Sequence, residues 1–90
     1  MSARDGDRAR VRVATRLEDG TLLDDSELRF EIGMGEVIEG IDRGVIGMRA
    51  GEKRTLHLPP ELAYGSRGAP PRVPPETPLV VELELIAIER

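Results

Sequence analysis

The chain has no cysteine and no tryptophan, and its 90 residues include only one phenylalanine and one tyrosine. Without cysteine, disulfides and thiolate metal sites are excluded. With so few aromatic rings, a hydrophobic core has to be built from leucine, isoleucine and valine. No stretch approaches the roughly 20 apolar residues of a membrane-spanning helix, and residues 1–10 lack the apolar segment of a secretory signal. We therefore expect a cytoplasmic protein that makes no membrane contact.

Charges of both signs are spread along the chain. The formal net charge is −4, which does not favour nucleic acid as a partner. The chain is 39% hydrophobic and 33% charged, a composition typical of a folded globular protein rather than a disordered one. Because a chain of this length can bury one modest core, we predict a single domain over residues 1–90. We also expect a monomer.

Alternation of apolar and charged residues predicts the strands. Ala9, Val11 and Val13 alternate with arginines, and this period of two is typical of a half-buried strand over residues 9–17. The same period predicts strands over 28–32, 53–58 and 79–88, and the apolar pair at 22–23 leaves room for a short fifth strand. Most links are too short for parallel crossovers, so we expect antiparallel pairing.

Residues 36–48 change period and predict one short helix. Their apolar residues follow the spacing of a helix face, namely Val37, Ile38, Ile41, Val45 and Met48. Glycines at 40, 44 and 47 interrupt this face, and each costs about 1 kcal/mol relative to alanine inside a helix. A glycine-broken loop is the alternative. Glycines on an apolar helix also indicate close packing against a sheet, which gives an α+β domain of four to five strands and one helix.

Prolines are concentrated in residues 59–78, which also hold the only tyrosine, Tyr64. Pro59 and Pro60 end the preceding strand because proline cannot donate to a sheet ladder. Residues 61–64 could form one helical turn, with Pro60 at its first position. Beyond Gly65 we predict a loop up to Pro78, and its prolines restrict the freedom of the unfolded chain.

Candidate reactive groups are sparse. His57, the only histidine, is predicted on the solvated side of a strand, and the serines occupy turn contexts without a histidine near them in sequence. The carboxylates near residues 18–25 lack the spacing of a calcium loop. Asp24 is an exception among them, since it follows the apolar pair at 22–23 that could draw it towards the core. We therefore predict no metal, no cofactor and no nucleophile, so an enzymatic reaction here must need little covalent chemistry.

Three segments together resemble a known family. Gly33 to Arg54 reads GMGEVIEGIDRGVIGMRAGEKR, LPPELAYGSRG follows at 58–68, and VPPETPLVVELELIAI completes the set at 73–88. With LEDGTLLDDS at 17–26, the chain resembles an FKBP-type peptidyl-prolyl cis/trans isomerase domain in a short, aromatic-poor form. The resemblance covers almost the whole chain. It implies a bent antiparallel sheet wrapped around a short helix, with a shallow apolar pocket between them.

The resemblance also implies an activity and its residues. The reaction is rotation about an Xaa–Pro peptide bond, and the ligands are proline-containing polypeptides and macrolides. Tyr64 matches the tyrosine whose hydroxyl reaches a ligand carbonyl, Asp24 matches the acid beside the pocket, and Ile38 matches a backbone N–H donor. The other positions that match the pocket lining are Val13, Leu23, Phe30, Val37, Ile41, Val73 and Val81.

Four of these lining positions hold aliphatic residues where the family usually has aromatic rings: Val13, Leu23, Ile41 and Val81. Aromatic contacts contribute about 0.5–1.5 kcal/mol beyond the area they bury, so we expect a weak isomerase. The alternative is a non-catalytic, chaperone-like module that holds proline-containing or apolar peptide segments in the same groove. A third hypothesis is an interaction domain whose pocket has collapsed.

Overall fold

The computed structural model describes residues 1–89, in which four strands and one α-helix are present. The strands are β1 (Arg8–Leu17), β2 (Leu22–Glu31), β3 (Lys53–Leu58) and β4 (Leu79–Glu89). The helix α1 covers Glu39–Gly44, and a 3-10 turn, η1 (Pro60–Leu62), follows β3. All strand pairs are antiparallel, in the order β2-β1-β4-β3. The α+β fold expected from the sequence is confirmed.

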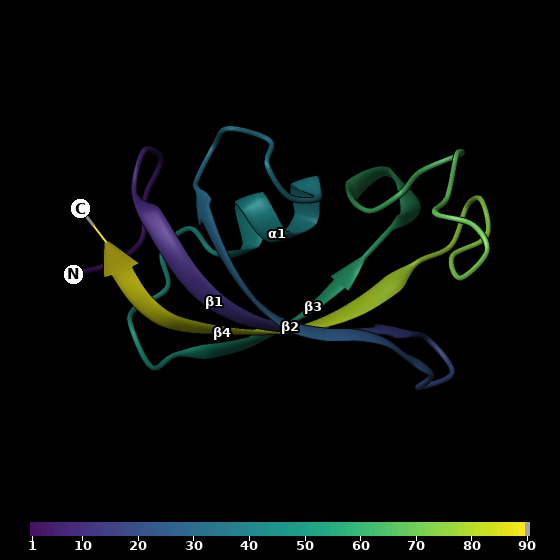
Figure 1. The fold of residues 1–90 in the computed structure, drawn as a ribbon, viewed down its shortest axis with the longest axis horizontal. Coiled ribbons are helices and arrows are strands. Elements are labelled where there is room, and N and C mark those ends of the chain that lie inside the picture. The colour runs from purple at the N-terminus through teal and green to yellow at the C-terminus, as the bar shows by residue number, and fades with distance from the viewer. Residues whose placement is uncertain (90) are drawn as a thin grey trace.

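The sheet is strongly bent, and α1, η1 and the long loop after η1 lie on its concave side (Figure 1). Figure 1 shows α1 over the middle of this side, with η1 and the long loop that follows it over one end. The inward residues of β1 are Ala9, Val11 and Val13, all buried, which is the phase that the alternation predicts. The bend therefore creates a one-sided hydrophobic layer between the sheet and α1.

The main core is aliphatic apart from one ring. Phe30 is 1% exposed and Met48 is fully buried, and the remaining members are alanine, valine, leucine and isoleucine. A second, smaller cluster consists of Leu23, Val73 and Leu79, and it lies beneath the loop after η1. Burying a side chain of this size stabilises the fold by about 1.5–3 kcal/mol, so the small cluster fixes that loop to the sheet.

Two glycines bring α1 unusually close to β3. A Cβ atom added at Gly40 would lie 2.4 Å from Leu58 Cδ2, and one added at Gly44 would lie 2.5 Å from Leu56 Cδ1. Real side chains do not approach at such distances, so only glycine permits this packing without movement of the leucines. The predicted reason for the glycines is confirmed at these two positions. Gly47, by contrast, lies beyond the helix with φ +86°, where it makes a turn.

The helix is shorter than the sequence predicted, six residues instead of thirteen. Val37 and Ile38, assigned to its apolar face, precede it. Ile38 is the N-cap and has an extended ψ of 147°. Gly33 and Gly35 adopt φ of 92° and 68°, so the chain leaves β2 through a loop that only reaches helical geometry at residue 39.

The strand prediction for residues 22–32 was also wrong in detail. The pair at 22–23 and the stretch at 28–32 belong to one strand, β2, which pairs with β1 over nearly its whole length. The polar residues between them do not interrupt the strand, because each of them pairs with a residue of β1. Asp25, for example, lies opposite Ala14. A polar run in a strand with one solvated face is compatible with the ladder.

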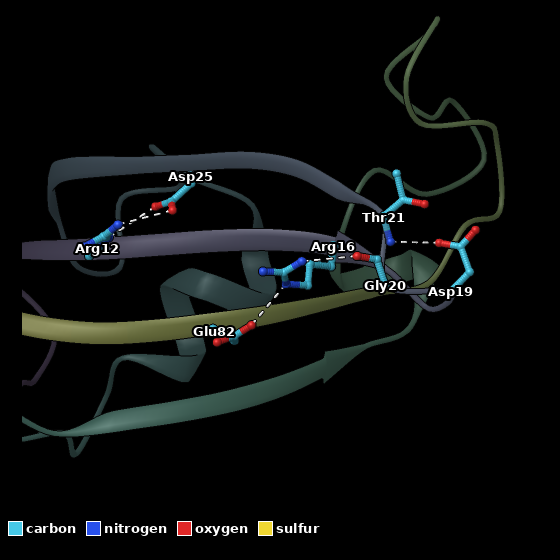
Figure 2. Close-up of polar contacts among 7 residues, drawn as sticks. All are labelled: Arg12, Arg16, Asp19, Gly20, Thr21, Asp25 and Glu82. Carbon is cyan, nitrogen blue, oxygen red and sulfur yellow. Dashed lines mark hydrogen bonds and ion pairs between the residues drawn. The ribbon is translucent and has the colours of Figure 1, made fainter.

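The convex face of the sheet is covered by cross-strand ion pairs. Arg12 Nε lies 3.2 Å from Asp25 Oδ1, and Arg16 Nε lies 3.1 Å from Glu82 Oε1. Figure 2 shows both pairs. The hydrogen bond from Arg12 lowers the pKa of Asp25, and the same contact raises the pKa of Arg12. Exposed pairs of this kind contribute little to stability, because water and salt screen them. Their main effect is to keep this face solvated, so ligand binding is left to the concave side.

None of the helices in residues 1–89 is long and apolar enough to cross a membrane.

We predict that Gly40→Ala destabilises the domain even though alanine favours helix formation. Overpacking against Leu58 costs about 1–3 kcal/mol, whereas the gain in helix propensity is about 1 kcal/mol, so the net loss of stability should reach up to about 2 kcal/mol. Urea denaturation would measure the change. Arg43→Ala is the control, since its side chain is 69% exposed and the free energy of unfolding should change by less than about 0.5 kcal/mol. A Gly40→Ala variant more stable than the wild type would contradict the packing argument.

Candidate active site

A cavity of about 380 Å³ lies on the concave side, between α1, the Thr15 end of β1, the start of β2 and the loop after η1. Its lining is mostly apolar, with two charged side chains and one phenol ring. The lining residues are Val13, Thr15, Leu23, Asp24, Leu28, Val37, Ile38, Ile41, Tyr64, Ala69, Arg72 and Val73. A second depression, of about 370 Å³, lies on the convex face among the ion pairs. Its lining is mostly charged, and Arg12 and Arg16 there are ion-paired with Asp25 and Glu82, so the mostly apolar concave cavity is the better candidate site.

Eight of the ten predicted site residues line this cavity. Phe30 and Val81 do not, although both are buried in the main core. Phe30 pairs with Ala9, far along β2 from the cavity. Val81, on β4, pairs with Thr15 of β1. It is fully buried, so it belongs to the core that lies beneath the cavity lining.

The floor of the cavity is aliphatic and open. Val13 is 2% exposed and Ile41 is 5% exposed, and both belong to the main core. Side chains of this size leave a measurable volume above them instead of filling it. The hypothesis of a collapsed pocket is therefore not supported.

A β-bulge on β2 explains how Leu23 and Asp24 both reach the cavity. Neighbouring residues of a regular strand point to opposite faces. Here Thr15 pairs with Asp24 while Arg16 pairs with Leu22, which leaves Leu23 as the extra residue. A bulge lets both neighbours contribute to one face. Leu23 is buried, but Asp24 is exposed, so the expectation that the apolar pair draws Asp24 into the core was wrong: it lies at the rim.

The Asp24 carboxylate is oriented by its own strand. Its Oδ2 accepts a hydrogen bond from Ser26 Oγ at 2.7 Å. The two residues share a face because they are two apart along β2. This bond occupies one oxygen, and the other accepts no hydrogen bond within residues 1–89.

Asp42 on α1 holds the loop that carries Val37 and Ile38. Its Oδ1 accepts from Gly33 N at 2.8 Å and its Oδ2 accepts from Gly35 N at 3.3 Å. The carbonyl of Ile38 accepts from the N–H groups of residues 41 and 42, at 3.0 and 3.1 Å. Both ends of the loop are thus bonded to the helix, which fixes the entrance of the cavity.

The loop after η1 is built on hydrogen bonds around two glycines. Gly65 N donates to Pro60 O at 2.7 Å, and Gly68 N donates to Tyr64 O at 3.0 Å. Gly68 has φ +67°, and a Cβ there would lie 2.5 Å from Val73 O. Any other residue at 68 would clash with the backbone. These contacts place Tyr64 at the rim, where it is 39% exposed.

Two hydrogen-bond donors at this rim are unused within residues 1–89. The Tyr64 hydroxyl makes no hydrogen bond there, and the Ile38 N–H donates none. Both residues line the cavity. The site therefore combines an apolar floor with donors suited to carbonyl oxygens, which is the pattern of a ligand-binding pocket.

Sequence reasoning missed Thr15, Leu28, Ala69 and Arg72. Thr15 and Leu28 lie at inward-facing positions of their strands, so the alternation of apolar and polar residues could have identified them. Ala69 and Arg72 lie in the proline-rich loop, where no regular alternation of residues indicates which side chains face the cavity. His57 is exposed on β3, as predicted. The described residues hold no group of three or more histidine, cysteine or carboxylate side chains that could bind a metal.

A bent antiparallel sheet with a helix on its concave side and an apolar cavity between them is the arrangement that the resemblance implies, and comparisons with known proteins agree with it. The model of the family "FKBP-type peptidyl-prolyl cis-trans isomerase" matches residues 1–86. The mouse protein "Peptidyl-prolyl cis-trans isomerase FKBP2" is 46% identical over 95 residues, covering 100% of this chain and 68% of its own length. The Saccharomyces cerevisiae protein "Peptidyl-prolyl cis-trans isomerase FPR2" is 44% identical, covering 99% of this chain and 70% of its own length.

A solved structure is similar over the whole chain. A peptidyl-prolyl cis-trans isomerase from Pseudomonas syringae superposes with a TM-score of 0.87 at 35% identity, covering 100% of this chain and 69% of that one. The chain belongs to the FKBP-type peptidyl-prolyl cis-trans isomerase family. It is an isomerase of Xaa–Pro bonds, as the resemblance implied.

We predict that Asp42→Ala loosens the cavity entrance. Removal of both acceptors leaves the Gly33 and Gly35 N–H groups to water, at a cost of about 0.5–2 kcal/mol in the free energy of unfolding. Amide hydrogen exchange at Gly33 and Gly35 should accelerate, and KM for a proline peptide should rise more than kcat falls. Glu39→Ala, at an exposed position of the same helix, is the control. Unchanged exchange at both glycines would contradict this role.

Proposed function

We propose that isomerisation takes place in the concave cavity, with Tyr64, Ile38 and Asp24 as the residues that touch the substrate. The observation that supports this most directly is the pair of unused donors above an aliphatic floor. The prolyl ring would fill the volume over Val13 and Ile41. The peptide on either side of it would lie across the rim.

The chemistry suits a site without a nucleophile. The Xaa–Pro bond has partial double-bond character, and its uncatalysed barrier is about 18–20 kcal/mol. Resonance makes the planar ground state more polar than the twisted transition state. An apolar cavity that removes water from the bond therefore disfavours the planar form relative to the twisted one. This difference lowers the barrier because only differential binding accelerates a reaction.

The rim residues would fix the peptide while one carbonyl rotates. The Tyr64 hydroxyl and the Ile38 N–H each donate to a substrate carbonyl, one on each side of the proline. The free oxygen of Asp24 accepts an N–H from the flanking chain. These bonds hold the ends of the substrate, so that thermal rotation is confined to the bond between them.

The aliphatic floor supports a weak activity. Ring faces give rigid, geometry-dependent contacts worth about 0.5–1.5 kcal/mol each, and neither Val13 nor Ile41 provides one. Relatives named "FK506-binding protein 2", such as the Yarrowia lipolytica protein at 45% identity, support macrolide binding in the same cavity. By the same argument the affinity would be reduced. A cytoplasmic location and a monomeric state stay predictions from the sequence.

We predict that Tyr64→Phe lowers kcat/KM on an Ala-Pro peptide by about 2- to 10-fold, since one hydrogen bond contributes about 0.5–1.5 kcal/mol. NMR exchange spectroscopy of the cis and trans peptide signals measures the rate. Stability should not change, because the hydroxyl has no partner within residues 1–89. If the variant bound peptide normally while neither it nor the wild type accelerated exchange, the cavity would be a holding site and the alternative of a chaperone-like module would be favoured.

We predict that Ile41→Trp raises ligand affinity by about 2- to 10-fold, because a ring at the floor adds about 0.5–1.5 kcal/mol of contact energy. The same change overfills the floor and should cost about 1–3 kcal/mol of stability. Titration with FK506 and with the Ala-Pro peptide measures affinity, and urea denaturation verifies that the variant is folded. A folded variant with unchanged affinity would show that Ile41 is not the floor of the binding site.

A further inference from the structure

The cavity lining contains two charged side chains, Asp24 on β2 and Arg72 on the loop after η1. Five other arginines have carboxylate partners within 4 Å: Arg10, Arg12, Arg16, Arg43 and Arg54. Arg72 makes no ion pair or hydrogen bond within residues 1–89. Asp24 does not neutralise it, because no oxygen of that carboxylate lies within 4 Å and one oxygen is bound to Ser26 Oγ at 2.7 Å. An unpaired cation therefore lines a mostly apolar cavity.

The backbone that carries Arg72 is well fixed. Residues 70–72 form a three-residue turn between Ala69 and Val73, whose backbones exchange hydrogen bonds of 2.8 and 3.0 Å. Two of the three turn residues are prolines with restricted φ. Val73 is 4% exposed and packs in the small core cluster with Leu23 and Leu79. Only the rotamers of the arginine itself remain to be ordered when a ligand binds.

We propose that Arg72 is a specificity-determining residue that selects substrates with an acidic side chain directly before or directly after the proline. The inference rests on the proposed function, because it needs the prolyl ring to occupy this cavity. A guanidinium presents a planar fork of donors that matches a carboxylate. An acidic neighbour of the proline would bring such a carboxylate to the rim where Arg72 lies. The apolar floor would still bind the ring, so the charge adds selectivity without replacing the basic recognition.

The expected size of the effect follows from exposure. Arg72 is exposed, and an exposed ion pair contributes about 0.2–1 kcal/mol, which corresponds to about 1.4- to 5-fold in kcat/KM. The formal net charge of −4 repels acidic peptides from the whole surface. The preference of the wild type for acidic peptides therefore understates the attraction between Arg72 and the substrate carboxylate. The preference has to be compared between variants.

The test uses two peptide pairs, Glu-Pro against Gln-Pro and Pro-Glu against Pro-Gln, with kcat/KM measured by NMR exchange spectroscopy. In at least one of the two pairs, the ratio of kcat/KM for the Glu peptide to that for the Gln peptide should fall about 1.4- to 5-fold in Arg72→Gln. The ratio should fall further in Arg72→Glu, and Arg72→Lys should keep part of the wild-type preference. The difference in this ratio between the wild type and Arg72→Gln should shrink in about 1 M salt, where the Debye length is about 3 Å.

Arg67→Gln is the matched control. Arg67 lies on the same loop, is exposed, and does not line the cavity, so the variant makes the same change in net charge at a distance. Its ratios should equal those of the wild type. The proposal is overturned if Arg72→Gln leaves both ratios unchanged, or if Arg67→Gln lowers them equally. If the wild type accelerated none of the four peptides and no Ala-Pro peptide, the proposed function itself would fail, which is a different result from lost selectivity.

Discussion

The close approach of α1 to β3 is the constraint on which the site depends. Gly40 and Gly44 let the helix backbone rest on Leu58 and Leu56 without an intervening side chain. This contact sets the depth at which Ile41 lies, and therefore the height of the cavity above its floor. Because Asp42 follows on the same helix and binds the preceding loop, the entrance is positioned by the same contact. The packing of α1 on β3 therefore determines the geometry of the site.

Much of the fold could be predicted from alternation alone, because a sheet with one buried face has a strong period of two. The core phase of β1 and the outward side of β3 were predicted in this way. The limits of the helix could not be, since Val37 and Ile38 have helical spacing but lie in a loop that glycines with positive φ impose. A single sequence shows spacing, whereas the loop depends on a distant acceptor at Asp42.

The site residues also fall into those that could be predicted from the sequence and those that could not. Resemblance to a family supplied Tyr64, Asp24 and Ile38, and the structure places them around one cavity. No local pattern could reveal that Leu23 and Asp24 share a face, because the register shift opposite Arg16 is a property of two paired strands. Arg72 was missed for a related reason: an arginine in an aperiodic loop has no signal that distinguishes the cavity from solvent.

The position of the single tyrosine has a spectroscopic consequence. The chain has no tryptophan and one phenylalanine, and that ring is buried in the core. Nearly all intrinsic fluorescence excited near 280 nm must therefore come from Tyr64, at the cavity rim. A peptide that covers this ring would alter its emission directly, without a label and without background from other residues. Because the chain has so few aromatic rings, one tyrosine can report whether the cavity is occupied.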